Sequence, residues 1–313
     1  MTVSRIHSPY GVQLHTDAMG ASVVLDGIVS QGLSTETTVE SKSTSGEIYR
    51  RFLALVAQNP MARFATHNIA TALDNVGLTG LPIAAATNPG VNFFAYAHLA
   101  GGSRKTGSNH RKYNFKLGIV VPKRLRIRHQ QSAELEYEII PIWDGTNDPI
   151  VIADTSAVPT QGGDVERFGL KSVAVGGVTI GQVQEVELDF GLKVSAKGGD
   201  GDIWNSFVSI DEVEPKISIT TTDVEAFKSS NIPLIGKAAA HADTLIKLRK
   251  RAQGGTFVAD ATAEHILLTA CGLAYVTEPF ADEDNKAAVK LELCCRYDGT
   301  NAPVVFDTTY ALA

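Results

Sequence analysis

The feature of this sequence that most limits its possible folds is an internal repeat. Residues 143–158, WDGTNDPIVIADTSAV, return 154 residues later as residues 297–312, YDGTNAPVVFDTTYAL, and half of the paired positions are identical. Unrelated sequences of average composition would match at roughly one position. The match therefore predicts an internal duplication.

The repeat extends over most of the chain. Residues 46–52 match residues 201–207, and the alanines at 84–86 match those at 238–240, with nearly the same offset. Each copy has the length of a typical domain, and two copies are too few for a solenoid. We expect an N-terminal arm at 1–23, a first domain at 24–159, a linker at 160–177 and a second domain at 178–313.

Composition limits the class of protein. The chain has 313 residues, is 44% hydrophobic and carries a net charge of −6. A domain of half this length buries roughly two-thirds of its unfolded surface. The acidic balance argues against binding nucleic acid by neutralising phosphates. The start of the chain lacks the continuous apolar segment of a signal peptide, so we expect synthesis in the cytosol.

The three cysteines, Cys271, Cys294 and Cys295, all lie in the second half. Leu117, Ile140 and Pro141 occupy the matching positions of the first half, so the cysteines are not a disulfide framework shared by both copies. We expect them to pack in the core. We expect no metal and no cofactor.

Alternating residues predict strands, and therefore a mainly β fold. In residues 183–190 and 134–139, acidic and apolar side chains alternate, which puts the acids on one face of each strand. The expected acidic face consists of Glu185, Glu187, Asp189, Glu134, Glu136 and Glu138. Asn68 and Asp223 are good N-caps, so we expect about one helix in each half.

Basic residues gather near two glycine pairs and on one further strand. The strand at 123–128 places three arginines on one face. One interpretation is a solvated edge strand that discourages aggregation; the other is a basic rim that contacts an acidic surface of a neighbouring subunit. The candidate basic contacts are Arg104, Lys105, Arg124, Arg126, Arg128, Lys247 and Arg249.

The repeated Asp-Gly-Thr-Asn sequence predicts a tight turn in each half, because glycine adopts positive φ freely. Its residues are Asp144, Gly145 and Asn147, and Asp298, Gly299 and Asn301. No regular set of acidic ligands follows at the spacing of a calcium loop, so a structural role is expected. Motifs for nucleophilic, phosphate-binding or zinc-dependent catalysis are absent. We therefore expect a protein that is not an enzyme.

Taken together, the duplication, the module length and the order of elements resemble the tail tube proteins of long-tailed bacteriophages, specifically the type with two tandem tube domains. The resemblance covers nearly the whole chain, and no short motif carries it. It implies two tail-tube-like β-barrel or sandwich domains, each with about one α-helix. It also implies trimeric rings that look six-fold and stack into a tube around a DNA-conducting lumen.

The same resemblance implies partners and a location. The chain would contact other copies of itself and tail proteins such as the tape measure, terminator and distal tail proteins. DNA would pass through without specific binding, and the protein would be made in the bacterial cytoplasm and end in the virion tail. The acidic face would line the lumen and the basic residues would contact neighbouring subunits or rings. Ser30, Gly32 and Ser34 occupy the matching positions of the first copy, so the acidic lining would not be uniform.

Other functions stay open at this point. The acidic faces also fit an ordinary solvated surface. Another tail or capsid ring or decoration protein could use a similar fold. A tandem β-sandwich that binds carbohydrate would need exposed aromatic residues at matched positions, and the pairs Tyr49/Trp204 and Trp143/Tyr297 fit packing as well as binding.

Overall fold

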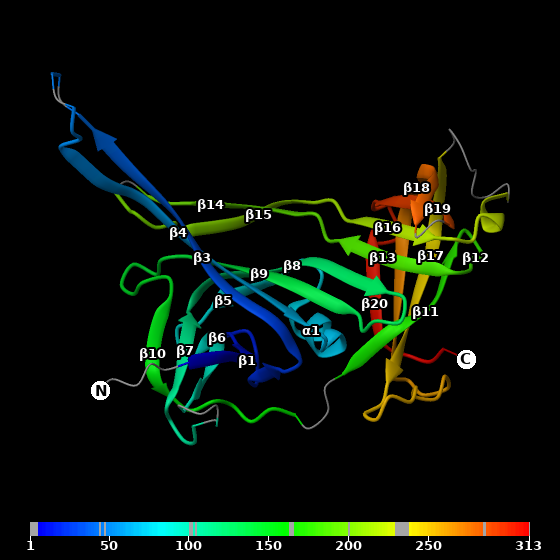
Figure 1. The fold of residues 1–313 in the computed structure, drawn as a ribbon, viewed down its shortest axis with the longest axis horizontal. Helices are drawn as coiled ribbons and strands as arrows, with labels where there is room; N and C mark the ends of the chain where they lie inside the picture. The colour runs from blue at the N-terminus through cyan, green and yellow to red at the C-terminus, as the bar shows by residue number, and fades with distance from the viewer. Residues whose placement is uncertain are drawn as a thin grey trace.

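A computed structural model describes residues 6–43, 45–46, 48–99, 103, 105–162, 166–199, 201–228, 238–283 and 286–312. Within these residues the fold is mainly β, with antiparallel sheets and a single α-helix (Figure 1). The prediction of a mainly β fold is confirmed. No helix in this part of the chain is long and apolar enough to cross a membrane.

In its described residues, the first half contains ten strands and the α-helix. They are β1 (Ile6–His15), β2 (Val23–Leu25), β3 (Ile28–Lys42), β4 (Phe52–Thr66), α1 (Ile69–Val76), β5 (Leu81–Ala84), β6 (Gly90–His98), β7 (His110–Phe115), β8 (Leu117–Arg128), β9 (Glu134–Pro141) and β10 (Val151–Ser156).

Among the residues described in the second half, there are ten further strands and a 3-10 turn. They are β11 (Arg167–Val175), β12 (Val178–Ile180), β13 (Val183–Asp189), β14 (Leu192–Lys197), β15 (Phe207–Val213), β16 (Lys216–Thr221), η1 (Glu225–Lys228), β17 (Ala239–Arg251), β18 (His265–Glu283), β19 (Lys286–Cys295) and β20 (Val304–Tyr310).

The core lies on one face of the large sheet, as alternation along the strands requires. On β13, Val186 and Leu188 are fully buried, whereas the neighbouring acids face the other side. Aromatic rings fill the core of the first half, where Phe64 stacks on Tyr137 with ring centroids 5.0 Å apart and meets Phe93 edge-on at 5.6 Å. Burial of such side chains is the main stabilising contribution.

One sheet runs through both halves of the molecule. Its strand order is β12-β11-β17-β18-β19-β16-β13-β8-β9-β4-β3, with β20 and β5 paired at its side. The halves meet at β13 and β8, which pair antiparallel in the register Glu185↔Arg128 to Asp189↔Arg124. The described strands of the single chain form open sheets and no closed barrel.

The order of strand pairing recurs in the two halves. In the first half β3, β4, β9 and β8 are neighbours in that order, and in the second half β13, β16, β19 and β18 are. Similarly, β1 pairs with β2 and β6, and β11 pairs with β12 and β17. A duplicated chain would give this shared order, and duplication itself stays the sequence-based prediction.

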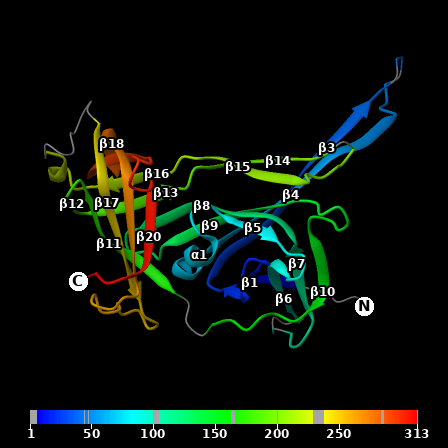
Figure 2. The same cartoon turned by 180° about the vertical axis from the view of Figure 1, so that it is seen from behind.

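Two hairpins extend from the sheet as arms. The hairpin of β3 and β4 projects away from the body, and the hairpin of β14 and β15 reaches from the second half over the first half toward β4 (Figures 1 and 2). We call them the first arm (residues 38–56) and the second arm (residues 192–213). The second arm is fastened at its tip, where the amide of Gln58 donates to the carbonyl of Ile203 at 2.6 Å.

The predicted domain boundaries stay a prediction, and the predicted helices need two corrections. The expected N-terminal arm contains β1, which pairs with β6, and the expected linker contains β11, which pairs with β17. The second half has only the 3-10 turn where a helix was expected; residues 229–237 are outside the described part of the chain. The Asn68 side chain makes no cap bond and instead donates to Asp26 at 2.7 Å, because both residues are buried.

Candidate functional site

The acidic and basic strands that the sequence singled out are neighbours on one sheet face. Strand β8 lies between β13 and β9, so the interpretation of residues 123–128 as an edge strand is wrong. Opposite its three arginines stand the acids of β13 on one side and those of β9 on the other. We call this set the charged ladder: Arg124, Arg126 and Arg128, with Glu185, Glu187, Asp189, Glu134 and Glu136.

Ion pairs connect the three strands of the ladder. Glu185 accepts hydrogen bonds from the Nε atoms of Arg126 at 2.7 Å and Arg128 at 2.9 Å. Arg124 donates to both oxygens of Glu136, at 2.9 and 3.1 Å. Glu187 lies 3.6 Å from both Arg124 and Arg126. The arginines therefore pair within the chain, and their predicted contact with a neighbouring subunit or ring stays a prediction.

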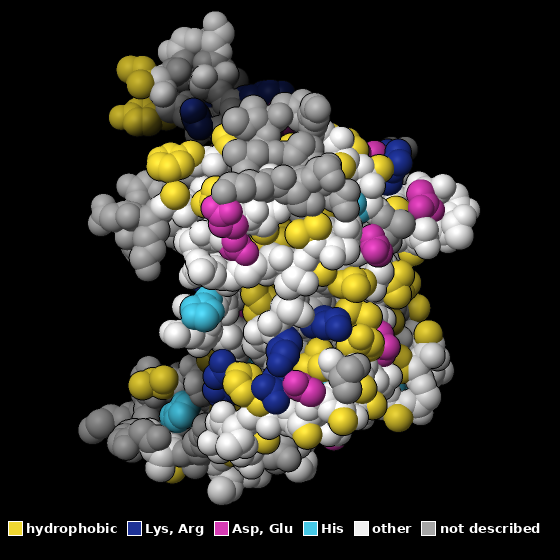
Figure 3. Space-filling view, turned by 90° about the vertical axis from the view of Figure 1, so that its right-hand side faces the viewer, with side chains coloured by type: hydrophobic (Ala, Val, Ile, Leu, Met, Phe, Trp, Pro, Cys, Tyr) yellow, Lys and Arg dark blue, Asp and Glu magenta, His cyan; other side chains and the backbone are white. Residues whose placement is uncertain are grey.

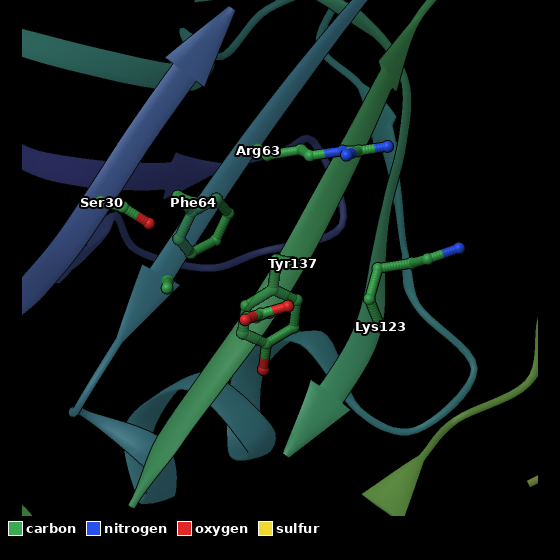
Figure 4. A pocket seen from close by; sticks show the side chains of 7 residues that line it. Ser30, Arg63, Phe64, Lys123 and Tyr137 are labelled. Atoms are coloured by element: carbon green, nitrogen blue, oxygen red, sulfur yellow. The ribbon is translucent and has the colours of Figure 1, made fainter. Parts of the chain in front are cut away.

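A second cluster extends the ladder toward β4. The nearly buried Glu138 accepts two hydrogen bonds from Arg63, at 2.9 and 3.0 Å, and lies 3.4 Å from the ammonium of Lys123. Arg63 and Lys123 border a hollow of about 350 Å³, in which Arg63 reaches from β4 across β9 (Figure 4). The charged side chains that line it already have partners, because Arg63 and Lys123 pair with Glu138. Glu136, which also lines the hollow, pairs with Arg124.

Charge on this face is nearly balanced. With Arg63 and Lys123 included, five cations lie among the six acids that were predicted to form an acidic face. Sequence analysis missed Arg63 and Lys123, because only strand neighbours reveal their position. The one available signal was the alternation of residues 61–65, which puts Arg63 on the face opposite to the core residue Phe64. The face is therefore an ion-pair network and is not uniformly acidic.

The charged ladder lowers the pKa of its central carboxylate, Glu185. Burial alone would raise the pKa of Glu185, but hydrogen bonds from Arg126 and Arg128 outweigh it, and the pKa lies below its ordinary value. The hydrogen bond to Glu136 raises the pKa of Arg124. Both shifts favour the charged forms, as expected for paired groups.

We expect stability to fall with acidification below about pH 4.5, the ordinary pKa of a glutamate. A carboxyl whose pKa is lowered by folding contributes stability above its unfolded pKa, and this contribution is lost as the pH falls through the folded pKa. The check is the melting temperature of the wild type and Glu185→Gln at pH 7 and pH 3. The wild type should be the more stable at pH 7, and the difference should shrink at pH 3. A difference that is unchanged by pH would contradict this.

The other predicted basic residues lie elsewhere. Lys105 donates its backbone amide to Ala97, and Arg104 lies outside the described residues. On β17, the Lys247 ammonium lies over the Tyr310 ring at 5.3 Å, and Arg249 lies over Phe257 at 4.7 Å and pairs with Asp260 at 2.8 Å. On the side of the molecule that is on the right in Figure 1, Lys and Arg side chains gather among hydrophobic ones in the lower half (Figure 3).

The two Asp-Gly-Thr-Asn turns have the same hydrogen bonds. Asp144 accepts the amides of Thr146 at 2.8 Å and Asn147 at 2.6 Å, and Asp298 accepts those of Thr300 at 2.9 Å and Asn301 at 2.7 Å. Gly145 and Gly299 have φ of 88° and 97°, which favours glycine. For Asp298 the amide of Asn301 is the largest cause of a pKa well below its ordinary value. This geometry supports a structural role for both turns.

Metal binding and known relatives give no further assignment. No group of three or more potential ligands is arranged to hold a metal ion in the described ranges. The three cysteines are free thiols, and Cys271 is buried. No known family model and no curated protein matches the chain.

Proposed function

We propose that this chain is a structural subunit of a bacteriophage tail tube, with two tandem domains that arose by duplication. Three copies would form a ring that looks six-fold, and rings would stack around a lumen that conducts DNA. The observation that carries the proposal is the junction of β13 and β8, which joins the two halves edge to edge in a single sheet. Such a junction can continue from copy to copy, because sheet closure across subunits covers exposed edges.

Free sheet edges support continuation of the sheet. Strand β3 is the last strand of the large sheet, and most of its residues are exposed. On β18, residues 275–283 pair with β19 on one side and with no strand of the described residues on the other. Long edges of this kind favour pairing with another chain.

The charged ladder fits the face of a DNA channel. Arginines attract DNA by neutralising its phosphates and releasing counterions. Here carboxylates already hold Arg124, Arg126 and Arg128, so few uncompensated cations face solvent. DNA would slide past such a face with little binding. We place the ladder on the lumen side, and we place the partners among other tail proteins assembled in the bacterial host.

Negative-stain electron microscopy of the concentrated, purified protein tests the proposal. Hollow cylinders with six-fold-looking end views are expected. Single rings that never stack would instead favour a terminator, distal tail or decoration protein. A monomer at all concentrations would contradict self-assembly of the chain alone.

A further inference from the structure

The tip of the second arm has a defined seat on the first half of the same chain. Ile203 accepts the amide of Gln58 at 2.6 Å, and Asn205 accepts the amide of Trp143 at 2.8 Å. The rings of Trp143 and Trp204 lie 6.1 Å apart. Trp204 also borders a hollow that residues of β3, β4 and the segment before β10 line. Both tryptophans are half-buried as a result.

Three residues of this contact have similar counterparts in the repeat. Ile203 and Trp204 of the second arm correspond to Ile48 and Tyr49 of the first arm, and Trp143 corresponds to Tyr297. The receiving turns also match, since Asp144 and Asp298 make the same hydrogen bonds. An arm tip with an isoleucine and an aromatic residue, and a turn preceded by an aromatic residue, therefore occur a second time in the chain.

The tip of the first arm and the turn at Tyr297, which corresponds to the turn at Trp143, are both exposed. Ile48 is 94% exposed, Tyr49 83% and Tyr297 64%. The first arm projects away from the body on the side opposite to β19 and β20, between which the Tyr297 turn lies (Figures 1 and 2). Within one chain the tip therefore does not reach the seat.

We infer that the first arm of each copy docks on the second half of another copy, with Tyr49 against Tyr297. This contact between copies would be of the same kind as the contact that the second arm makes within one chain. Aromatic side chains such as these contribute binding energy through buried area and offset stacking. The inference rests on the self-assembly part of the proposed function, and it names the surface through which copies meet.

The free strands agree with the same arrangement. Within the chain, residues 185–189 pair with residues 124–128. Their counterparts are residues 30–34 on the edge strand β3 and residues 279–283 on β18, where one backbone edge is unpaired among the described strands. One arm contact and one strand pairing would thus join each copy to the next. Such a head-to-tail contact uses two different surfaces and gives rings if its rotation closes.

A mixing experiment with cysteine variants tests the inference. In a background in which Cys271, Cys294 and Cys295 are alanine, one protein carries Tyr49→Cys and another Tyr297→Cys, and a short bifunctional thiol reagent is added. We expect a covalent dimer in the mixture and none with either protein alone. A chain with both substitutions should give cross-linked products of two and three chains, and none larger. Circular dichroism confirms that each variant is folded.

The matched control replaces Tyr297→Cys by Ala263→Cys. Ala263 is exposed in the loop that joins β17 to β18, whereas the Tyr297 turn joins β19 to β20. This mixture should give no dimer. Equal cross-linking of the control, dimers of Tyr49→Cys with itself, or no dimer in the original mixture would each overturn the inference. A specific cross-link in particles that never become tubes would support the inference and contradict the tube proposal.

Discussion

Leu188→Ala is expected to lower the free energy of unfolding by about 2–5 kcal/mol, the usual cost of truncating a fully buried leucine. Leu188 stands opposite Leu125 at the junction of β13 and β8, and both are fully buried. The substitution removes methyl groups and leaves a cavity between the two halves. Chemical denaturation monitored by circular dichroism measures the effect.

The matched control acts on the opposite face of the same strand pair. Arg126→Met keeps the apolar stem and removes the charge of a side chain that is 33% exposed. Ion pairs with this exposure contribute about 0–1 kcal/mol. We therefore expect a small effect. A cost as large as that of Leu188→Ala would contradict this and show that the charged ladder contributes as much as the apolar face to joining the halves.

Gly191→Val is expected to destabilise the protein strongly and to release the second arm. Gly191 lies between β13 and β14, where the arm leaves the sheet, and its φ is +59°. A Cβ here would overlap the carbonyl oxygen of Glu214, and the amide of Glu214 donates to Gly191 at 3.1 Å. Residues other than glycine pay about 1–3 kcal/mol for such a backbone conformation, and the overlap adds to this cost.

Tryptophan fluorescence reports the release directly. The chain has two tryptophans, and both lie in this contact: Trp204 at the tip of the second arm and Trp143 on the first half that receives it. Gly191→Val should shift their emission to longer wavelength, as the rings become exposed to water. Gly177→Val is the control, because Gly177 has a φ of +76° but open space at its Cβ. If both variants behave alike, backbone conformation and not the overlap determines the effect.

Local patterns in the sequence could be interpreted with success. Alternation in residues 183–190 predicts which side chains share a face, because side chains of a strand alternate whatever its neighbours are. The turn at Asp144 could be predicted for the same reason, since its hydrogen bonds reach only to Asn147. Both features depend on residues that are adjacent in the chain.

Long-range features could not be predicted in this way. Glu185 and Arg126 were assigned to separate surfaces, although they form one ion pair across 59 residues of sequence. Nothing local to Asn68 reveals that its amide donates to Asp26 instead of capping the helix. Strand order determines these contacts, and local patterns in a single sequence do not reveal strand order.

We propose that copies of this chain join each other as its two halves join within it. Native mass spectrometry of the smallest ring, combined with end-on electron microscopy of the same sample, tests this most directly. We expect three chains in a ring with six similar lobes. A ring with six chains, or a two-fold dimer with identical surfaces in contact, would contradict it.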